Sequence, residues 1–196
     1  MFHKEKKGNQ KKIVGVYSLN SLDETLKFSI PLAITARNSC YKEVVLLEMG
    51  NRHDVSKIRR FFAAKLLTSK GDFQLDGMKF VPDATIQEAE HWAAKDNIYL
   101  ILDCGNLEEL WDEINKMCYE KITFCSMIEW KIDATSRYLQ EKGVGIGGIF
   151  MVTEGKHNIQ QIKKKTNLKI RPWELINDPF CINRETLSEM YRMFCV

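Results

Sequence analysis

The chain has 196 residues, of which 44% are hydrophobic, and a formal net charge of +3. This length can bury one sizeable core and is short for two, so we expect one domain over residues 12–196 after a flexible basic tail at residues 1–11. A net charge this small does not by itself indicate a nucleic-acid partner, and no apolar run approaches the roughly 18 residues of a membrane-spanning helix.

The number and spacing of the cysteines limit the class of protein further. Six are present, and they form no CxxC pair and no metal-ligand spacing with the four histidines. No apolar leader precedes them. We therefore expect reduced thiols, a cytoplasmic protein and no bound metal, with peripheral contact as the only membrane association open to the chain.

Short aliphatic runs alternate along the chain with segments of helical length and period. Runs that are apolar on consecutive residues are typical of strands covered on both faces. In chain order we expect a strand at 13–17, helix 26–37, strand 44–47, helix 54–67, an ordered surface loop at 68–77, strand 78–81, helix 86–95, strand 98–102, helix 107–117, strand 122–125, helix 130–142, a glycine-rich strand within 144–152 and a helix at 185–194. This alternation predicts a three-layer, doubly wound α/β fold, with a mainly parallel sheet between helices on both faces.

The carboxyl ends of the parallel strands are the place to seek a site, because ligands of such sheets bind beyond them. Ser18, Glu48, Asp103 and Ser126 fall at this edge. Asp103 has two interpretations of equal weight, as a metal-site acid or as a cap for helix or loop amides. Glu48 is more typical of a solvated acid than of a ligand.

The segment after the first strand has the order of a phosphate-binding P-loop, with a strand, a loop and the start of a helix. Residues 19–25 nevertheless contain no glycine and no lysine, and they include two acids. A phosphate cradle needs glycines to turn backbone N–H groups toward the anion and a lysine to neutralise it. Pro31 either lies inside the following helix or begins it, and a late start would move the helix N-terminus away from the phosphate position.

Five segments in order carry a family resemblance: KKIVGVYS, KEVVLLEMGNR, GMKFVPD, DNIYLILDCGNL and KITFCSMIEWKIDATSRYL. Together they resemble the ParA/MinD branch of the deviant Walker A, SIMIBI-class P-loop ATPases, over residues 11–172. The resemblance aligns Asn20 with the family's signature lysine and Thr25 with its phosphate lysine. Ser21 falls on a glycine, while Glu48 and Asp103 align with acids that position metal and water.

The resemblance implies a pocket remnant formed by Ser18, Asn20, Ser21, Thr25, Glu48 and Asp103, without the means to hold a triphosphate. We therefore expect a pseudo-ATPase with no cofactor, acting as a dimer or with a protein partner as a scaffold or localisation factor. Family members position plasmids, division septa and pili, and the degenerate loop is most similar to TadZ-type members. The sequence leans against enzymatic activity.

Two alternatives stay open. The first is an active switch of the same family, which binds ATP and Mg²⁺ through the side chains of Asn20, Ser21 and Thr25. The second is a DNA-binding partition protein that uses the basic patch Lys163, Lys164 and Lys165. This patch is more typical of a solvated face, although it could also bind DNA phosphates or anionic lipid. The helix at 185–194 carries two acids and one arginine on its polar face, which favours docking on the sheet or on a partner over lipid.

Overall fold

The structure is a computed structural model of the chain. It describes residues 11–19, 23–39, 41, 43–62, 65–106, 108–128, 135, 148–160, 163, 169–174 and 176–194.

These residues form one nine-stranded sheet, in the order β3-β4-β5-β2-β6-β1-β7-β8-β9. The strands are β1 Lys12–Ser18, β2 Glu43–Met49, β3 Lys65–Leu66, β4 Phe73–Leu75, β5 Met78–Ala84, β6 Ile98–Gly105, β7 Glu120–Ser126, β8 Ile149–Glu154 and β9 Lys169–Pro172. Every pairing is parallel except β3 with β4 and β4 with β5. The mainly parallel sheet confirms the predicted fold class.

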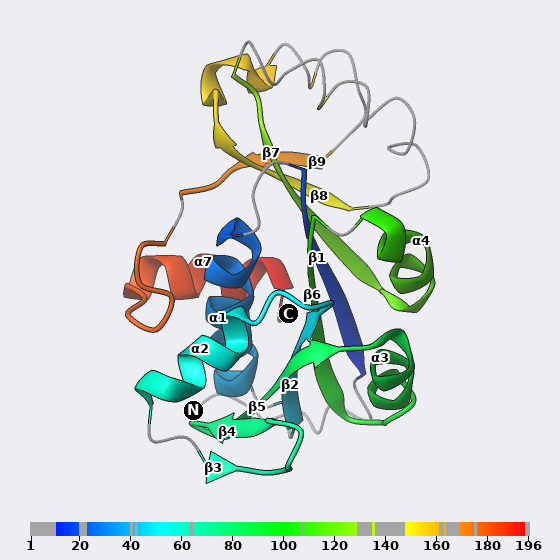
Figure 1. Cartoon of the computed structure of the whole chain (residues 1–196). Helices are drawn as coiled ribbons and strands as arrows, with labels where there is room; N and C mark the ends of the chain where they lie inside the picture. Colours follow the sequence, from blue (N-terminus) through cyan, green and yellow to red (C-terminus); the bar gives the residue numbers. More distant parts are fainter. Residues whose placement is uncertain are drawn as a thin grey trace.

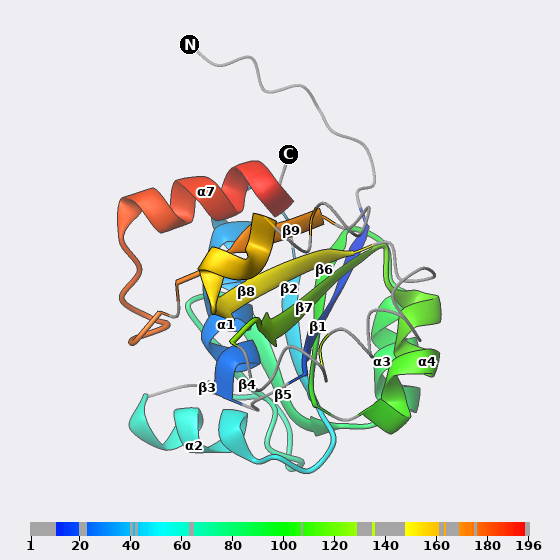
Figure 2. The ribbon, with the colours of Figure 1, turned by 90° about the horizontal axis from the view of Figure 1, so that it is seen from above.

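Helices cover both faces of the sheet, as Figures 1 and 2 show. The helices are α1 Asp23–Asn38, α2 Asp54–Phe61, α3 Ile86–Ala93, α4 Glu108–Met117 and α7 Arg184–Phe194, with a short 3₁₀ turn at Lys156–Asn158. Helices α1, α2 and α7 pack on one face, and α3 and α4 pack on the other. All eight residues of β6 are buried as a result, which explains why its sequence is apolar on consecutive residues.

Helix α1 settles the two interpretations of Pro31. The helix begins at Asp23 and contains Pro31 in its interior, so the alternative of a late start at Pro31 is wrong. An interior proline costs about 3 kcal/mol because it removes a helical hydrogen bond. Here the helix is buried on both sides of it, since Phe28, Ile30 and Leu32 are at most 1% exposed, and this burial offsets the cost.

Two predicted elements between β2 and β5 are wrong in part. The helix expected at 54–67 ends at Phe61, because Phe62 has an extended backbone, and Lys65–Leu66 form strand β3 instead. The loop expected at 68–77 contains strand β4, which pairs with both β3 and β5. The helix expected at 130–142 lies outside the described residues except for Thr135, as do residues 144–147 of the expected strand.

Phe28 joins three parts of the core. Its ring makes edge contacts with Phe124 of β7, Trp173 after β9 and Phe194 of α7, at centroid distances of 5.2, 5.1 and 5.6 Å. Helix α7 therefore docks on the fold through its apolar face, which confirms one of the two dockings expected for it. Within the described residues, no helix is long and apolar enough to cross a membrane.

Candidate functional site

Strand register places two acids next to each other at the carboxyl edge of the sheet. Glu48 near the end of β2 pairs with Asp103 of β6. Ser18 ends β1, the neighbour of β6 on its other side. All three side chains are 0% exposed. Two buried carboxyl groups at one edge need a compensating charge or donors, because burial of an unpaired charge is costly.

Arg52 supplies this charge from the loop between β2 and α2. Its guanidinium donates through Nη2 to Asp103 Oδ1 at 2.7 Å and to the Asp103 carbonyl oxygen at 3.2 Å. Its Nη1 donates to the Thr25 hydroxyl, in the first turn of α1, at 3.1 Å. The Arg52 side chain is 5% exposed. We call Thr25, Glu48, Arg52 and Asp103 the Arg52 cluster.

Glu48 caps helix α2. Its Oε1 accepts from the backbone N–H groups of Asp54, at 2.8 Å, and Val55, at 3.2 Å, while Oε2 also lies 3.2 Å from the Val55 nitrogen. The residue at the N-cap position, His53, makes no side-chain cap bond. A carboxylate at the first free N–H groups of a helix is stabilised by those donors and by the helix dipole. The expectation of a solvated acid at this position is therefore wrong.

Burial and charge shift the pKa values of this cluster in identifiable ways. Burial raises the pKa of Glu48 above its usual 4.5, and Asp103 adds to the rise, while the amides of Val55 and Asp54 and the charge of Arg52 oppose it. For Arg52, burial acts to lower the pKa, but the charges and hydrogen bond of the neighbouring carboxylates outweigh it and the net shift is upward. Arg52 is therefore a permanent cation.

The described residues of this edge do not fit a magnesium nucleotide. Asp103 Oδ1 is bound to the guanidinium, and Oδ2 is buried without a hydrogen bond among the described residues. Glu48 is turned onto the amides of α2. A divalent cation at Asp103 would lie beside the positive charge of Arg52 and would have to displace it. No group of three or more acidic, histidine or cysteine side chains suited to a metal occurs in the described part of the chain.

The sequence-predicted site residues have different outcomes. Thr25, Glu48 and Asp103 come together around Arg52, and Ser18 is buried at the same edge. Asn20 and Ser21 lie outside the described residues. Sequence reasoning missed Arg52. The sequence did contain a signal for it. Two buried acids need a nearby cation, and Arg52 follows the end of β2 by only three residues.

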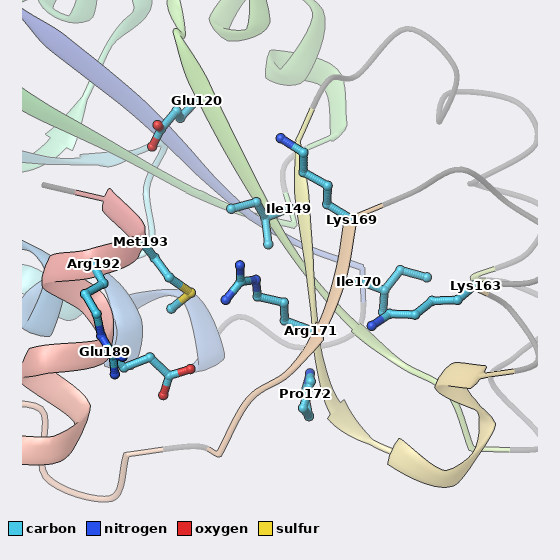
Figure 3. A pocket seen from close by; sticks show the side chains of 10 residues that line it. All are labelled: Glu120, Ile149, Lys163, Lys169, Ile170, Arg171, Pro172, Glu189, Arg192 and Met193. Carbon is cyan, nitrogen blue, oxygen red and sulfur yellow. The ribbon is translucent and has the colours of Figure 1, made fainter. Parts of the chain in front are cut away.

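A second polar feature is a cleft of about 940 Å³ between β8, β9 and α7. Figure 3 shows side chains from these elements and from Lys163 around it. Its cations are Lys163, Lys169, Arg171 and Arg192, and its carboxylates are Glu120 and Glu189. Lys163 is exposed, while Lys164 and Lys165 are not among the residues that the structure places. Part of the predicted basic patch therefore lines a cleft with other cations.

No protein-family model and no curated protein matches the sequence. Solved structures do match the fold. A protein from Borrelia burgdorferi B31 described as a plasmid partition protein, bound to AMPPNP, superposes with a TM-score of 0.62 at 12% identity, over 94% of this chain and 97% of that one. MinD from the MinC:MinD cell division complex of Aquifex aeolicus gives 0.57 at 8% identity, over 93% and 86%. A ParA family ATPase from Chlorobium tepidum gives 0.57 at 10% identity, over 94% and 90%.

The chain therefore has the fold of the ParA/MinD-type P-loop ATPases, along nearly its whole length. At these identities the likeness is one of fold, and it confirms at that level the resemblance inferred from the five sequence segments.

Proposed function

We propose that this chain is a ParA/MinD-like pseudo-ATPase. It keeps the fold of the ATPases, does not hydrolyse ATP, and acts through protein contacts as a scaffold or localisation factor. The observation that carries this proposal is the buried ion pair of Arg52 and Asp103, at 2.7 Å, with the same guanidinium bound to Thr25.

The chemistry of phosphoryl transfer explains why this pair matters. Transfer depends on positioning the phosphates and neutralising their charge with backbone donors, a lysine and Mg²⁺. Under the resemblance, Thr25 stands at the lysine position and Asp103 at a metal-site acid. Both are bound to Arg52, and Glu48, the other aligned acid, is committed to α2. Thr25, Glu48 and Asp103 thus all make contacts within the fold.

A protein partner or a second copy of the chain is the proposed ligand class. One of the similar structures is a complex of MinD with MinC, which makes protein contact a reasonable expectation for a chain of this fold. We propose a cytoplasmic role in a pilus, secretion or partition apparatus. Light scattering on the purified chain measures whether it forms a homodimer, and a monomer would direct the search to a different protein.

Phosphate release from ATP in the presence of Mg²⁺ tests the inactive state. We expect the full chain to release phosphate at the rate of the protein-free blank, and Asp103→Ala to give the same rate. A rate above the blank that Asp103→Ala abolishes would overturn the proposal and favour the active switch. A rate that survives this substitution would indicate a contaminating ATPase, so each preparation is compared with the variant.

The cleft favours a second candidate function, the binding of DNA phosphates. Four cations against two carboxylates line it, and Glu120 is already paired with Lys12 at 3.0 Å. Phosphate contacts make affinity fall steeply with salt. We expect fluorescence anisotropy with duplex DNA to show this slope and Arg171→Glu to reduce it. An affinity that does not change with salt would exclude this function.

A further inference from the structure

The segment at residues 55–71 is strongly basic. It contains five cations and no acid, and these cations are Lys57, Arg59, Arg60, Lys65 and Lys70. Two of them are paired with acids outside the segment, Lys57 with Asp54 at 2.7 Å and Lys70 with Glu88 at 3.4 Å. The other three make no ion pair with any described residue. Most of the positive charge here is therefore available to a ligand.

The same segment exposes four large apolar side chains. Phe61 is 85% exposed, Leu66 55%, Phe62 39% and Leu67 38%. Only two other large hydrophobic residues are exposed among the described residues, Tyr119 and Tyr191. We call Arg59, Arg60, Phe61, Phe62, Lys65, Leu66 and Leu67 the α2–β3 surface. Clustered exposure of this kind marks an interaction site, whereas single exposed residues are ordinary.

The geometry explains why these side chains are uncovered. Helix α2 begins on the sheet, where Val55 is buried and Ile58 packs against the core. Phe61, the last residue of the helix, continues this apolar stripe three residues after Ile58, beyond the residues that the core covers, and Phe62 follows it with an extended backbone. The ring of Phe62 contacts that of Phe180, at a centroid distance of 4.7 Å. Figure 1 shows α2 and β3 at the same edge of the molecule.

We propose that the α2–β3 surface docks on an anionic lipid bilayer. Apolar side chains beside lysines and arginines, with no acid among them, suit the boundary between acyl chains and negative headgroups. The apolar groups enter the boundary, and the long basic side chains reach the headgroups.

Two observations favour a bilayer over a protein. The surface carries three cations without an ion pair to a described residue and no acid, so a protein partner would have to supply matching carboxylates, whereas each basic residue adds affinity for anionic lipid without such matching. Strand β3 is the edge of the sheet but has only two residues, too few for a second copy to extend the sheet by pairing. The positive charge of the α2–β3 surface therefore favours an anionic bilayer over a protein partner.

Co-sedimentation of the full chain with vesicles tests this proposal. We expect binding to vesicles of equal parts phosphatidylcholine and phosphatidylglycerol, weakened by salt, and no binding to phosphatidylcholine alone. Arg60→Glu and Lys65→Glu are each expected to lower the partition coefficient by about fivefold or more. Phe61→Ser is expected to lower it by about tenfold. All three side chains are exposed, so the fold should be retained.

Matched controls are Lys116→Glu and Tyr119→Ser, which change an exposed cation and an exposed aromatic residue outside the α2–β3 surface. Both should bind vesicles as the unchanged chain does. Equal binding to both vesicle types, or full binding by Phe61→Ser, would overturn the proposal. So would a failure to bind any vesicle while Phe61→Ser converts a dimer to a monomer in light scattering, which would assign the surface to self-association.

Discussion

At the scale of single residues, Arg52 organises the carboxyl edge of the sheet. One guanidinium binds the carboxylate and carbonyl of Asp103 and the hydroxyl of Thr25, so it links strand β6 to helix α1. A planar group with several donors can do this, whereas a lysine ammonium is a compact point charge. The stability of this edge should therefore depend on the guanidinium.

Removing Arg52 should be among the most destabilising changes in the chain. Arg52→Ala leaves a buried carboxylate without its cation and is expected to lower the free energy of unfolding by about 3–5 kcal/mol. The double variant with Arg52→Met and Asp103→Leu should recover most of this loss, because it removes both charges. Urea unfolding measures both effects.

Arg60→Ala, an exposed arginine of α2, is the control and should change the unfolding free energy by less than about 0.5 kcal/mol. An Arg52→Ala variant as stable as this control would show that the ion pair with Asp103 does not form.

Glu48 should make stability depend on pH. Its pKa in the folded chain is raised above 4.5, so the folded chain holds this proton more tightly than the unfolded chain. The stabilisation by neutral Glu48 is complete below pH 4.5 and is lost as pH rises through the folded pKa. Glu48→Gln cannot titrate and keeps an acceptor oxygen for Asp54 and Val55. The unfolding free energy of Glu48→Gln minus that of the unchanged chain should therefore increase as pH rises from 4.5.

Urea unfolding of both chains at a series of pH values measures this difference, with Glu90→Gln, an exposed acid of α3, as the control for general charge effects. A difference that stays constant, or that decreases as pH rises, would contradict the assigned direction of the shift.

At the scale of elements, what the sequence could predict depended on burial. Strands β1, β2, β5, β6 and β7 were predicted because most of their residues are buried and each contains a run of mainly apolar residues. Strands β3 and β4 were not predicted because they have only two and three residues and form the antiparallel end of the sheet, where pairing with neighbouring strands and not a hydrophobic period determines the structure. Asp76 and Gly77 were the overlooked signal, since this dipeptide favours a tight hairpin.

The β4–β5 turn should be sensitive to substitution at its glycine. Leu75 pairs with Met78, and Asp76 and Gly77 between them have φ of 49° and 79°, in the left-handed region. Gly77→Ala should cost about 1–2 kcal/mol of unfolding free energy, because a Cβ is strained there. Asp76→Gly relieves such strain and should change stability by less than about 0.5 kcal/mol. Equal effects of the two substitutions would argue against this turn geometry.

For the residues that form the site, the sequence predicted where the two acids lie on the sheet but not which side chain they contact. The alternation of strands and helices placed Glu48 and Asp103 at one edge without any knowledge of the structure. The partner of Asp103 could not be read from the sequence, because Arg52 and Asp103 are 51 residues apart and meet only through the parallel register of β2 and β6. Loop arginines are common, and only burial distinguishes this one.

At the scale of the whole molecule, the chain combines the fold of an ATPase with an arginine, Arg52, bound to one of the acids that the resemblance assigns to a metal site. The fold matches along nearly the full length of the AMPPNP-bound Borrelia protein. In this chain, Asp103 and Thr25 at the carboxyl edge are bound to Arg52, and further charged groups lie elsewhere, at the α2–β3 surface and in the β8–β9 cleft. This arrangement supports the proposed role of a protein that acts through contacts made by its surface.

Calorimetric titration of the purified full chain with ATP and Mg²⁺ tests this account most directly. We predict no binding tighter than about 100 µM, which corresponds to roughly 5.5 kcal/mol, because Arg52 already holds Asp103 and Thr25. Binding clearly tighter than this, and lost in Asp103→Ala while that variant stays folded, would show that the edge accepts a nucleotide and would contradict the account.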